Sequence, residues 1–409
     1  MRRARPRAAR GGSRVGERFE AVVGPVAHGG HCVVRLEGTG GPAAEPGGRP
    51  RVVFVRHAIP GERVVVEITE GTDGDRFWRG DAVEVLEASP DRVQPPCPFA
   101  APGRCGGCDF QHVTLERQRE LKAVVVREQL SRLAGIDAPV EVEPVPGDEE
   151  GLRYRTRIQW ATGAHGERGL RKHRSRDVVP VDDCRIARED ARAVDRAAPR
   201  TDGRTASPAA APATVTERVS VPSRGHHDFQ VASDGFWQVH AGVPSVLVAT
   251  VLELLEPQPG ETALDLYSGV GLFARFLADA VGAEGRVLAV EGDRTASGHA
   301  ESNLAGLPGV DVRCGAVDQV LAGELPAAYD STDLVVLDPP REGAREPVVE
   351  RVVARGPRAV AYVACDPAAL ARDLATFARL GYGLRSLRAF DAFPMTHHVE
   401  CVALLEKSR

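Results

Sequence analysis

The fold is decided by Ala263-Leu-Asp-Leu-Tyr-Ser-Gly-Val-Gly-Leu-Phe273, an apolar run that leads into a glycine turn and then a helical pattern. Such a turn lets a ligand approach the backbone at the carboxyl edge of a parallel sheet. Similar apolar runs recur, with helical stretches between them, at Gly285–Val290, Asp333–Leu337 and Ala359–Val363. We therefore predict an α/β fold with a doubly wound parallel sheet over residues 229–409.

Length and composition restrict the class of protein. The chain has 409 residues, of which 43% are hydrophobic and 27% charged, which is typical of two or three soluble domains. No stretch approaches the ~20 uninterrupted apolar residues of a membrane span. The first fourteen residues carry six arginines with no apolar core behind them. We expect a cytoplasmic protein with no membrane partner and a solvated basic tail at residues 1–14. The net charge of −5 argues against a globally basic nucleic-acid binder but allows a local basic surface.

Two further regions precede the predicted sheet domain. Residues 15–90 alternate β-rich runs such as Cys32–Leu36 and Arg63–Ile68 with Gly/Pro-rich turns, which predicts a small OB-like β-barrel. Residues 91–228 form a cysteine-bearing central domain that includes a flexible, Ala/Pro/Thr-rich insertion at 197–216. Barrels of the OB type often bind single-stranded or looped RNA; a purely structural module is the alternative.

An acidic residue ends the strand that follows the glycine turn. Glu291 is placed where a carboxylate accepts hydrogen bonds from both hydroxyls of a ribose. A nicotinamide enzyme uses such an acid too, but the turn Asp265-x-x-x-Gly269-x-Gly271 lacks the third glycine of the dinucleotide fingerprint. An Asp at the end of the first strand would repel a pyrophosphate and suits the cationic amine and sulfonium of S-adenosylmethionine. We therefore expect this cofactor, with Asp265, Gly269 and Glu291 at its site.

The next two strands bring reactive groups to the same edge. Asp338-Pro-Pro-Arg341 places a carboxylate and a rigid diproline there; amino-methyltransferases have a similar motif, but theirs ends in an aromatic residue. Cys365 follows the next strand. A thiolate at this place can add to C6 of a pyrimidine and turn C5 into a carbon nucleophile that attacks the methyl sulfonium. A buried, inert cysteine is the alternative.

Such a mechanism also needs a base that removes the C5 proton before the thiol leaves. Glu400 is the candidate, because a carboxylate that enters an apolar strand is costly unless it is paired or used. His397 and His398 are rival bases, for which hydrogen bonding or a surface role is expected instead. Cys401 alternates to the opposite face and is assigned to the core. We expect this last strand, which ends at Leu405, to close the sheet as an edge.

Taken together, several motifs resemble one family, the S-adenosylmethionine-dependent RNA 5-methyluridine methyltransferases with their iron-sulfur, TRAM-bearing rRNA branch. The matching segments are Cys105-Gly-Gly-Cys108-Asp-Phe-Gln-His112, Tyr154-Arg-Thr-Arg157, Phe236-Trp-Gln238, Asp265-Leu-Tyr267-Ser-Gly, Asp338-Pro-Pro-Arg341, Cys365-Asp-Pro-Ala-Ala-Leu-Ala-Arg-Asp and Phe393-Pro-Met-Thr-His-His-Val-Glu400. The resemblance implies a class I methyltransferase fold, a TRAM barrel, Cys365 as nucleophile and Glu400 as the base. It also implies that Gln238, Tyr267, Glu291 and Asp338 contact the cofactor and the target base. The family usually has Asn where this chain has Asp366, and often Asn at His240 and Leu272.

Four cysteines suggest a metal site. Cys97, Cys105 and Cys108 lie in a Gly/Pro-rich loop and Cys184 some seventy residues later, and four thiolates without a histidine suit zinc or an iron-sulfur cluster. Spacing does not choose between the two, and the resemblance favours a 4Fe-4S cluster. We expect the cluster to fold the module and present RNA contacts.

The predicted substrate is structured RNA. Between Arg153 and Arg176 there are eight Arg/Lys residues and one acid, Glu167, with Tyr154, Trp160 and two histidines interspersed. This pattern suits a strip that follows phosphates and whose aromatic rings stack on nucleotides; a solvated basic face is the alternative. We expect methylation of a flipped-out uridine, with 23S rRNA favoured and tRNA possible. A non-catalytic RNA-binding factor is a further alternative, and no obligate protein partner is implied. Cytosine is disfavoured because RNA 5-methylcytosine enzymes add a second cysteine in the motif that here reads Asp338-Pro-Pro-Arg341.

Overall fold

The chain divides into two compact units in a computed structural model, which describes residues 11–37, 50–193, 213–222 and 224–408. The barrel unit comprises Met1–Val125, Ala161–Arg185 and Pro394–His397, and the sheet unit comprises Val126–Trp160, Ile186–Phe393 and His398–Arg409. Most of the predicted tail and of the predicted insertion lie outside the described residues. The end of the tail is bound, since Ser13 forms a β-bridge with Thr72.

The barrel unit is built on one six-stranded sheet with the order β1-β5-β6-β4-β3-β2. The predicted β-rich runs are confirmed as strands. Their alternating valines form a core that includes Val34, Val53 and Val66. A small sheet, β11-β10-β9, belongs to the same unit. The strands are β1 (Arg18–Val22), β2 (Val26–Ala27), β3 (His31–Leu36), β4 (Arg51–Arg56), β5 (Arg63–Glu70), β6 (Phe77–Glu87), β9 (Ala161–Thr162), β10 (Arg168–Arg171) and β11 (Val178–Pro180).

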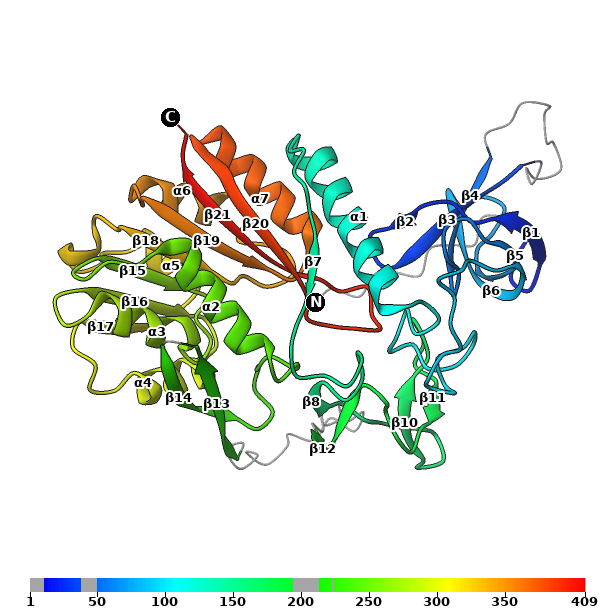
Figure 1. The fold of residues 1–409 in the computed structure, drawn as a ribbon, viewed down its shortest axis with the longest axis horizontal. Coiled ribbons are helices and arrows are strands. Elements are labelled where there is room, and N and C mark those ends of the chain that lie inside the picture. The colour runs from blue at the N-terminus through cyan, green and yellow to red at the C-terminus, as the bar shows by residue number, and fades with distance from the viewer. Residues whose placement is uncertain (1–10, 38–49, 194–212, 223, 409) are drawn as a thin grey trace. The chain divides into compact units, whose positions relative to one another are not determined.

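The sheet unit contains an eight-stranded sheet with the order β17-β16-β15-β18-β19-β21-β20-β7 (Figure 1). The five strands from β17 to β19 are mutually parallel, which confirms the predicted doubly wound sheet. The apolar residues of β15, β16, β18 and β19 are buried, as parallel strands covered by helices on both faces require, whereas β17 at the edge of the sheet is partly exposed. The strands are β7 (Val142–Pro144), β15 (Thr262–Leu266), β16 (Arg286–Glu291), β17 (Val310–Cys314), β18 (Leu334–Leu337), β19 (Ala359–Ala364), β20 (Tyr382–Asp391) and β21 (Glu400–Lys407).

The prediction that the last strand closes the sheet as an edge is wrong. β21 lies between β19 and β20 and is antiparallel to both. Its first six residues are all buried, and a strand buried on both faces is stable where both of its edges are paired. The edge is instead β7, which pairs with β20 through Val142–Pro144 and which the sequence did not reveal.

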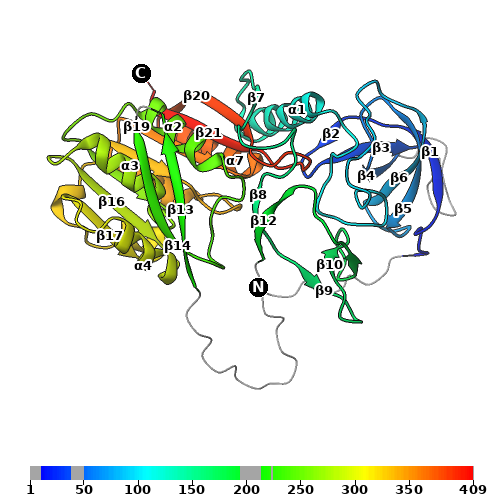
Figure 2. The same ribbon diagram turned by 60° about the horizontal axis from the view of Figure 1, so that its bottom comes forward.

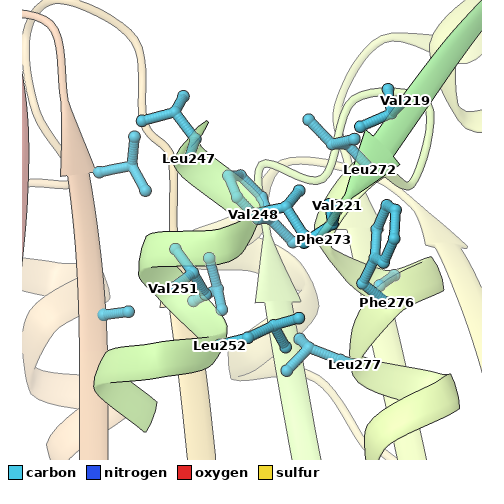
Figure 3. Close-up of a cluster of buried hydrophobic side chains, with 14 of the residues drawn as sticks. Val219, Val221, Leu247, Val248, Val251, Leu252, Leu272, Phe273, Phe276 and Leu277 are labelled. Atoms are coloured by element: carbon cyan, nitrogen blue, oxygen red, sulfur yellow. The ribbon is translucent and has the colours of Figure 1, made fainter. Parts of the chain in front are cut away.

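Helices cover the sheet and build the core. Side chains of α2, α3 and β13 point toward one another in a cluster that includes Leu247, Val251, Phe273, Phe276 and Val221 (Figure 3). α7 contacts β19 and β20, and α6 packs on α5 and α7. The helices are α1 (Leu115–Ala134), α2 (Val243–Leu255), α3 (Leu272–Val281), α4 (Arg294–Asn303), α5 (Val317–Ala322), η1 (Ala327–Tyr329), α6 (Glu346–Ala354) and α7 (Pro367–Arg379). Of these described helices, none is both long and apolar enough to cross a membrane.

Two smaller pairings complete the sheet unit. β13 (Thr214–Val221) and β14 (Gly225–Ala232) form an antiparallel hairpin, seen side by side in Figure 2, that contacts α2 and α4. β8 (Arg155–Ile158) pairs in parallel with β12 (Ala187–Ala193). The predicted domain boundary at residue 229 falls within β14, and the domain boundaries stay predictions.

Candidate active site

A cavity of about 1130 Å³ opens at the carboxyl ends of the parallel strands of the sheet unit. This is where ligands bind in doubly wound sheets, and the volume suffices for a nucleoside-sized ligand together with a base. Among the residues named from the sequence, those that line the cavity are Gln238, Tyr267, Gly269, Glu291, Asp338, Cys365 and Glu400. The structure therefore brings together the predicted catalytic pair and most of the predicted cofactor contacts.

The glycine turn forms the floor of the cavity. Tyr267 and Gly269 have φ angles of 66° and 56°, and Gly271, which caps α3, has a φ of 88°. The backbone N–H groups of Tyr267 and Ser268 both donate to the carbonyl of Val290. A Cβ atom at Gly269 would meet nothing within 4 Å, so glycine is required here by its backbone conformation. The chain is thereby folded back from β15 into α3 with its backbone exposed to the cavity.

Glu291 ends β16 and is held by two backbone groups. Its Oε2 accepts a hydrogen bond from the N–H of Gly269 at 2.8 Å, and its Oε1 accepts one from the N–H of Asp293 at 2.6 Å. These bonds fix the carboxylate at the cavity wall and tie it to the glycine turn. A carboxylate so placed can accept hydrogen bonds from ribose hydroxyls, as the sequence predicts.

Asp265 occupies a different place from the other predicted contacts. Its side chain is fully buried and does not line the cavity. Oδ2 accepts a hydrogen bond from the N–H of Ala274 in the first turn of α3 at 2.8 Å, while Oδ1 has no partner. Burial raises the pKa of Asp265 to about 7. The carboxyl group therefore holds α3 against the end of β15 from beneath the turn.

The reactive pair comes from two neighbouring strands. Ala364 of β19 is paired with Cys401 of β21, and the antiparallel register sets Cys365 beside Glu400. Burial, followed by the charges of Glu400 and Asp338, raises the pKa of the Cys365 thiol to about 12. Burial, followed by the charge of Asp338, also raises the pKa of Glu400 well above its usual range.

The cavity thus concentrates carboxyl groups that resist ionisation. Burial and the nearby Glu291 raise the pKa of Asp338 to about 7, and the guanidinium of Arg341 opposes the shift at Glu400 and Cys365. An anionic ligand is disfavoured in such a place, whereas a cation favours the charged form of each carboxyl group. The electrostatics therefore suit a sulfonium ligand.

Asp373, for which the sequence predicts no role, holds the loop after Asp338-Pro-Pro-Arg341. From α7, its Oδ2 accepts hydrogen bonds from the N–H of Ala344 at 2.7 Å and from the hydroxyl of Tyr362 at 2.5 Å. Gly343 approaches the same carboxylate so closely that a Cβ would lie 2.5 Å from Oδ2. A carboxylate on the buried face of a helical pattern was the signal that could have revealed this role.

The two rival histidines lie in different surroundings. His398 lines the cavity, and its Nε2 lies 3.3 Å from Nη2 of Arg341. His397 lies in the barrel unit, where its Nδ1 is 2.6 Å from Oδ2 of Asp109. Both form hydrogen bonds, as expected. Cys401 is fully buried, which confirms its assignment to the core.

The predicted basic strip is divided between the two units, and part of it is structural. Arg155 lines the cavity, and the guanidinium of Arg157 lies over the ring of the exposed Phe236, 5.7 Å from its centroid. Tyr154 is fully buried and stacks on His240 at 5.2 Å. The expectation that Tyr154 stacks on a nucleotide is therefore wrong, because the ring is part of the core.

The four predicted metal ligands all belong to the barrel unit. The charge of Cys97 influences the thiol of Cys105, and those of Cys105 and Cys184 influence Cys108. Gln111 links two of them, since its Oε1 accepts from the N–H of Cys97 and its Nε2 donates to Sγ of Cys108 at 3.1 Å. None of the four forms a disulfide. Among the described residues, no three His, Cys, Asp or Glu side chains are grouped closely enough to bind a metal ion.

The doubly wound sheet, the cavity at the carboxyl ends of its strands and the carboxyl groups around that cavity fit the class that the motifs predict, an S-adenosylmethionine-dependent methyltransferase. Comparison with known families agrees with this class. The family described as tRNA (Uracil-5-)-methyltransferase matches residues 323–408, and the TRAM domain family matches residues 12–83. The Protein-L-isoaspartate(D-aspartate) O-methyltransferase family matches residues 238–331, which include the glycine turn.

Whole-chain relatives define the family. An uncharacterized RNA methyltransferase of Streptomyces avermitilis is 44% identical over 96% of this chain and 99% of its own. The 23S rRNA (uracil(1939)-C(5))-methyltransferase RlmD of Shewanella amazonensis is 34% identical over 91% of this chain and 94% of its own. In fold, the chain is similar to the Pyrococcus abyssi tRNA (uracil-54, C5)-methyltransferase, whose structure was solved with S-adenosyl-L-homocysteine. The TM-score is 0.65 and the sequence identity is 22%, and the match covers 95% of this chain and 100% of that one. The chain belongs to the TRAM-bearing RNA (uracil-C5)-methyltransferase family, as its motifs predict, and is an S-adenosylmethionine-dependent enzyme of that family.

Proposed function

We propose that this enzyme methylates C5 of a uridine in 23S rRNA in the cytoplasm, with Cys365 as nucleophile and Glu400 as base. The observation that carries the proposal is that Cys365 and Glu400 enter one cavity from neighbouring strands, together with Glu291 and the glycine turn. The choice of 23S rRNA is supported by the activity that the names of several whole-chain relatives state.

The proposed steps balance as follows. Sγ of Cys365 bonds to C6 of the uracil, and the electron pair of the C5–C6 double bond moves to C5. S-adenosylmethionine supplies the methyl group that C5 takes up. The carboxylate of Glu400 then removes the C5 proton, the double bond re-forms and the C6–Sγ bond breaks. The net reaction consumes one S-adenosylmethionine and releases S-adenosylhomocysteine and a proton.

Four further residues that line the cavity have a proposed part in this reaction. Glu291 binds the ribose of the cofactor and Gln238 and Tyr267 contact the cofactor and target base. Asp338 contacts the polar groups near the reacting carbon. Burial and neighbouring carboxyl groups raise the pKa values of Glu400 and Cys365, and a bound sulfonium favours the ionised forms of both.

We also propose that Cys97, Cys105, Cys108 and Cys184 hold a 4Fe-4S cluster. The support is the set of four thiols, their mutual electrostatic influence and the amide donors that point at sulfur from Gln111 and the backbone of Gly107. Thiolate ligands with N–H donors are typical of such clusters. Iron and sulfide analysis of anaerobically purified protein tests this, and stoichiometric zinc would contradict it.

The substrate is tested by nucleoside mass spectrometry of separated 23S rRNA and tRNA from a deletion strain beside its parent. Loss of 5-methyluridine from 23S rRNA alone, restored by the wild-type gene, is the expected result. Loss from tRNA alone would contradict the rRNA assignment while leaving the chemistry intact. With purified protein and both RNAs, absence of any methyl transfer would favour a non-catalytic RNA-binding protein.

A further inference from the structure

The loop between β20 and β21 contains four residues that belong to the barrel unit. Pro394–His397 are part of that unit, whereas Phe393 and His398 on either side are part of the sheet unit. Glu400, the first residue of β21, follows His397 by only three residues. Whatever fixes Pro394–His397 therefore restrains the start of the strand that carries Glu400.

Met395 is bound on both its backbone and its side chain. Its carbonyl accepts hydrogen bonds from the N–H groups of Asp109 and Phe110 at 2.9 and 3.0 Å. Its own N–H donates to Oε1 of the buried Gln118 at 2.8 Å, and Nε2 of Gln118 lies 3.3 Å from its sulfur. Met395 has a φ of 66°, a conformation that persists in a residue other than glycine only when its surroundings fix it. The contacts supply that constraint.

His397 is bound twice by one carboxylate. Oδ2 of Asp109 lies 2.6 Å from Nδ1 of His397 and accepts its backbone N–H at 3.2 Å. Oδ1 of Asp109 lies 3.6 Å from Nη2 of Arg56, and the Asp109 side chain is only 10% exposed. A Cβ at Gly30 would lie 2.5 Å from Cβ of His397, so the histidine is also closely packed. Asp109 directly follows Cys108 in the cysteine loop.

We infer that Asp109, Gln118, Met395 and His397 form an anchor that positions Glu400 for removal of the C5 proton. The anchor residues are positioning residues, since they act through the chain that leads into β21. The inference rests on the proposed role of Glu400. It assigns to the cysteine loop a part in turnover, through Asp109, that is separate from RNA binding.

The chemistry gives this role a specific signature. Cys365 follows β19, which is paired with β18 and β21 in the sheet, so the anchor does not carry the nucleophile. After methyl transfer, the C6–Sγ bond breaks only when the C5 proton has been removed. Misplacing Glu400 therefore leaves methylated RNA covalently attached to Cys365. A general loss of stability produces no such adduct.

The experiment compares full-length variants in a reaction with 23S rRNA and S-adenosylmethionine carrying a labelled methyl group, read on a denaturing gel. His397→Ala is expected to raise the fraction of labelled RNA–protein adduct about tenfold over wild type. Asp109→Asn keeps an oxygen that accepts both hydrogen bonds and is expected to stay closer to wild type. Arg14→Ala is the matched control, because it removes another ion pair of the barrel unit, the one between Arg14 and Asp73. The side chain of Arg14 is 27% exposed and that of His397 is 28% exposed, so the two substitutions remove similarly exposed groups.

Glu400→Gln separates the two proposals. If Glu400→Gln accumulates adduct and His397→Ala does not, the anchor is overturned and the role of Glu400 stands. If Glu400→Gln turns over like wild type, the proposed base is wrong. Equal slowing by His397→Ala and Arg14→Ala without adduct would also overturn the anchor. If His397→Ala does not fold, His397→Gln replaces it, because glutamine keeps a hydrogen-bond donor. We expect a smaller rise in adduct for His397→Gln, and no rise at all would contradict the inference.

Discussion

The cavity of the sheet unit and the cysteine site of the barrel unit are built from different kinds of segment. Cys365 and Glu400 lie where neighbouring strands of one buried sheet end or begin, and backbone hydrogen bonds fix the register between those strands. Cys97, Cys105 and Cys108 lie in a loop, and Cys184 in another segment of the same unit. The cavity is thus complete in the folded chain, whereas no three metal-binding side chains are grouped among the described residues.

This difference shows how much of a site a fold supplies before any ligand binds. Strand ends are placed by a core of buried side chains, so the site inherits the rigidity of the sheet. A thiol cluster held by loops gains much of its order when metal binds, because the binding free energy is also folding free energy. Substitutions in the cavity should therefore reduce activity or cofactor binding, whereas substitutions in the cysteine site should reduce metal content and the stability of the barrel unit.

Cys365→Ala should have the largest effect. Without the thiol, no covalent bond to C6 forms, and methyl transfer should fall by about 10⁴-fold or more, since the nucleophile is part of a unit that works together. S-adenosylhomocysteine affinity should stay within about twofold, because the bonds at Glu291 are untouched. Single-turnover methyl transfer and calorimetry measure the two quantities. Residual methylation at the wild-type rate would exclude the covalent mechanism.

Glu291→Ala should have the second largest effect, by weakening cofactor binding. It removes the carboxylate that accepts the N–H groups of Gly269 and Asp293 and that we assign to the ribose. Hydrogen bonds to a charged group predict a loss of about 10- to 100-fold in S-adenosylhomocysteine affinity. Glu291→Gln, which keeps one acceptor oxygen, is the control. Unchanged affinity in the alanine variant would place the cofactor elsewhere.

The pH dependence of stability should show the buried carboxyl groups. The pKa values of Asp265 and Asp338 rise from the usual 3.8 to about 7 in the folded enzyme. Between these values the folded state holds protons that the unfolded chain has released, so this contribution to stability falls as the pH rises from about 4 to about 7. Thermal unfolding of Asp338→Asn beside wild type should show a smaller decrease over that range. Parallel curves would contradict the assigned shift.

Asp366 is one of the three positions where this chain departs from the family pattern. Its side chain caps α7 by accepting a hydrogen bond from the N–H of Ala369 at 2.8 Å. Asn caps equally well, so Asp366→Asn should leave the free energy of unfolding nearly unchanged, whereas Asp366→Ala should cost about 1 kcal/mol. Chemical denaturation measures both. A large loss in the asparagine variant would show that the charge, rather than the cap, matters next to Cys365.

Cys184→Ser should leave the cofactor contacts of the cavity unaffected and so defines the contrast between the two sites. We expect loss of bound iron and a lower melting temperature of the barrel unit. S-adenosylhomocysteine affinity should change by less than about twofold, since the cavity takes all its lining residues from the sheet unit. Calorimetry alongside iron analysis checks both. A large loss of cofactor affinity would show that the cavity depends on the cysteine site.

Much of the sheet and cavity could be predicted from local patterns. Apolar runs of strand length with helical stretches between them identified β15, β16, β18 and β19, although not the more polar β17. The residues that end these runs were identified as site residues because parallel strands end at one edge. The order of strands could not be read in this way. That β21 inserts between β19 and β20, and that Val142–Pro144 forms the outer edge, depends on pairing between distant segments.

The sequence by itself determined the chemistry: a thiol, a carboxylate base and a ribose-binding acid, each at the end or start of an apolar run. Only the tertiary structure decided which of these groups share a cavity. It placed Asp265 beneath the turn, Tyr154 in the core, Asp373 under the Asp338 loop and His397 against Asp109. The physical reason is that hydrophobic patterning specifies which face of an element is buried, whereas polar partners are chosen by contacts between segments far apart in the chain.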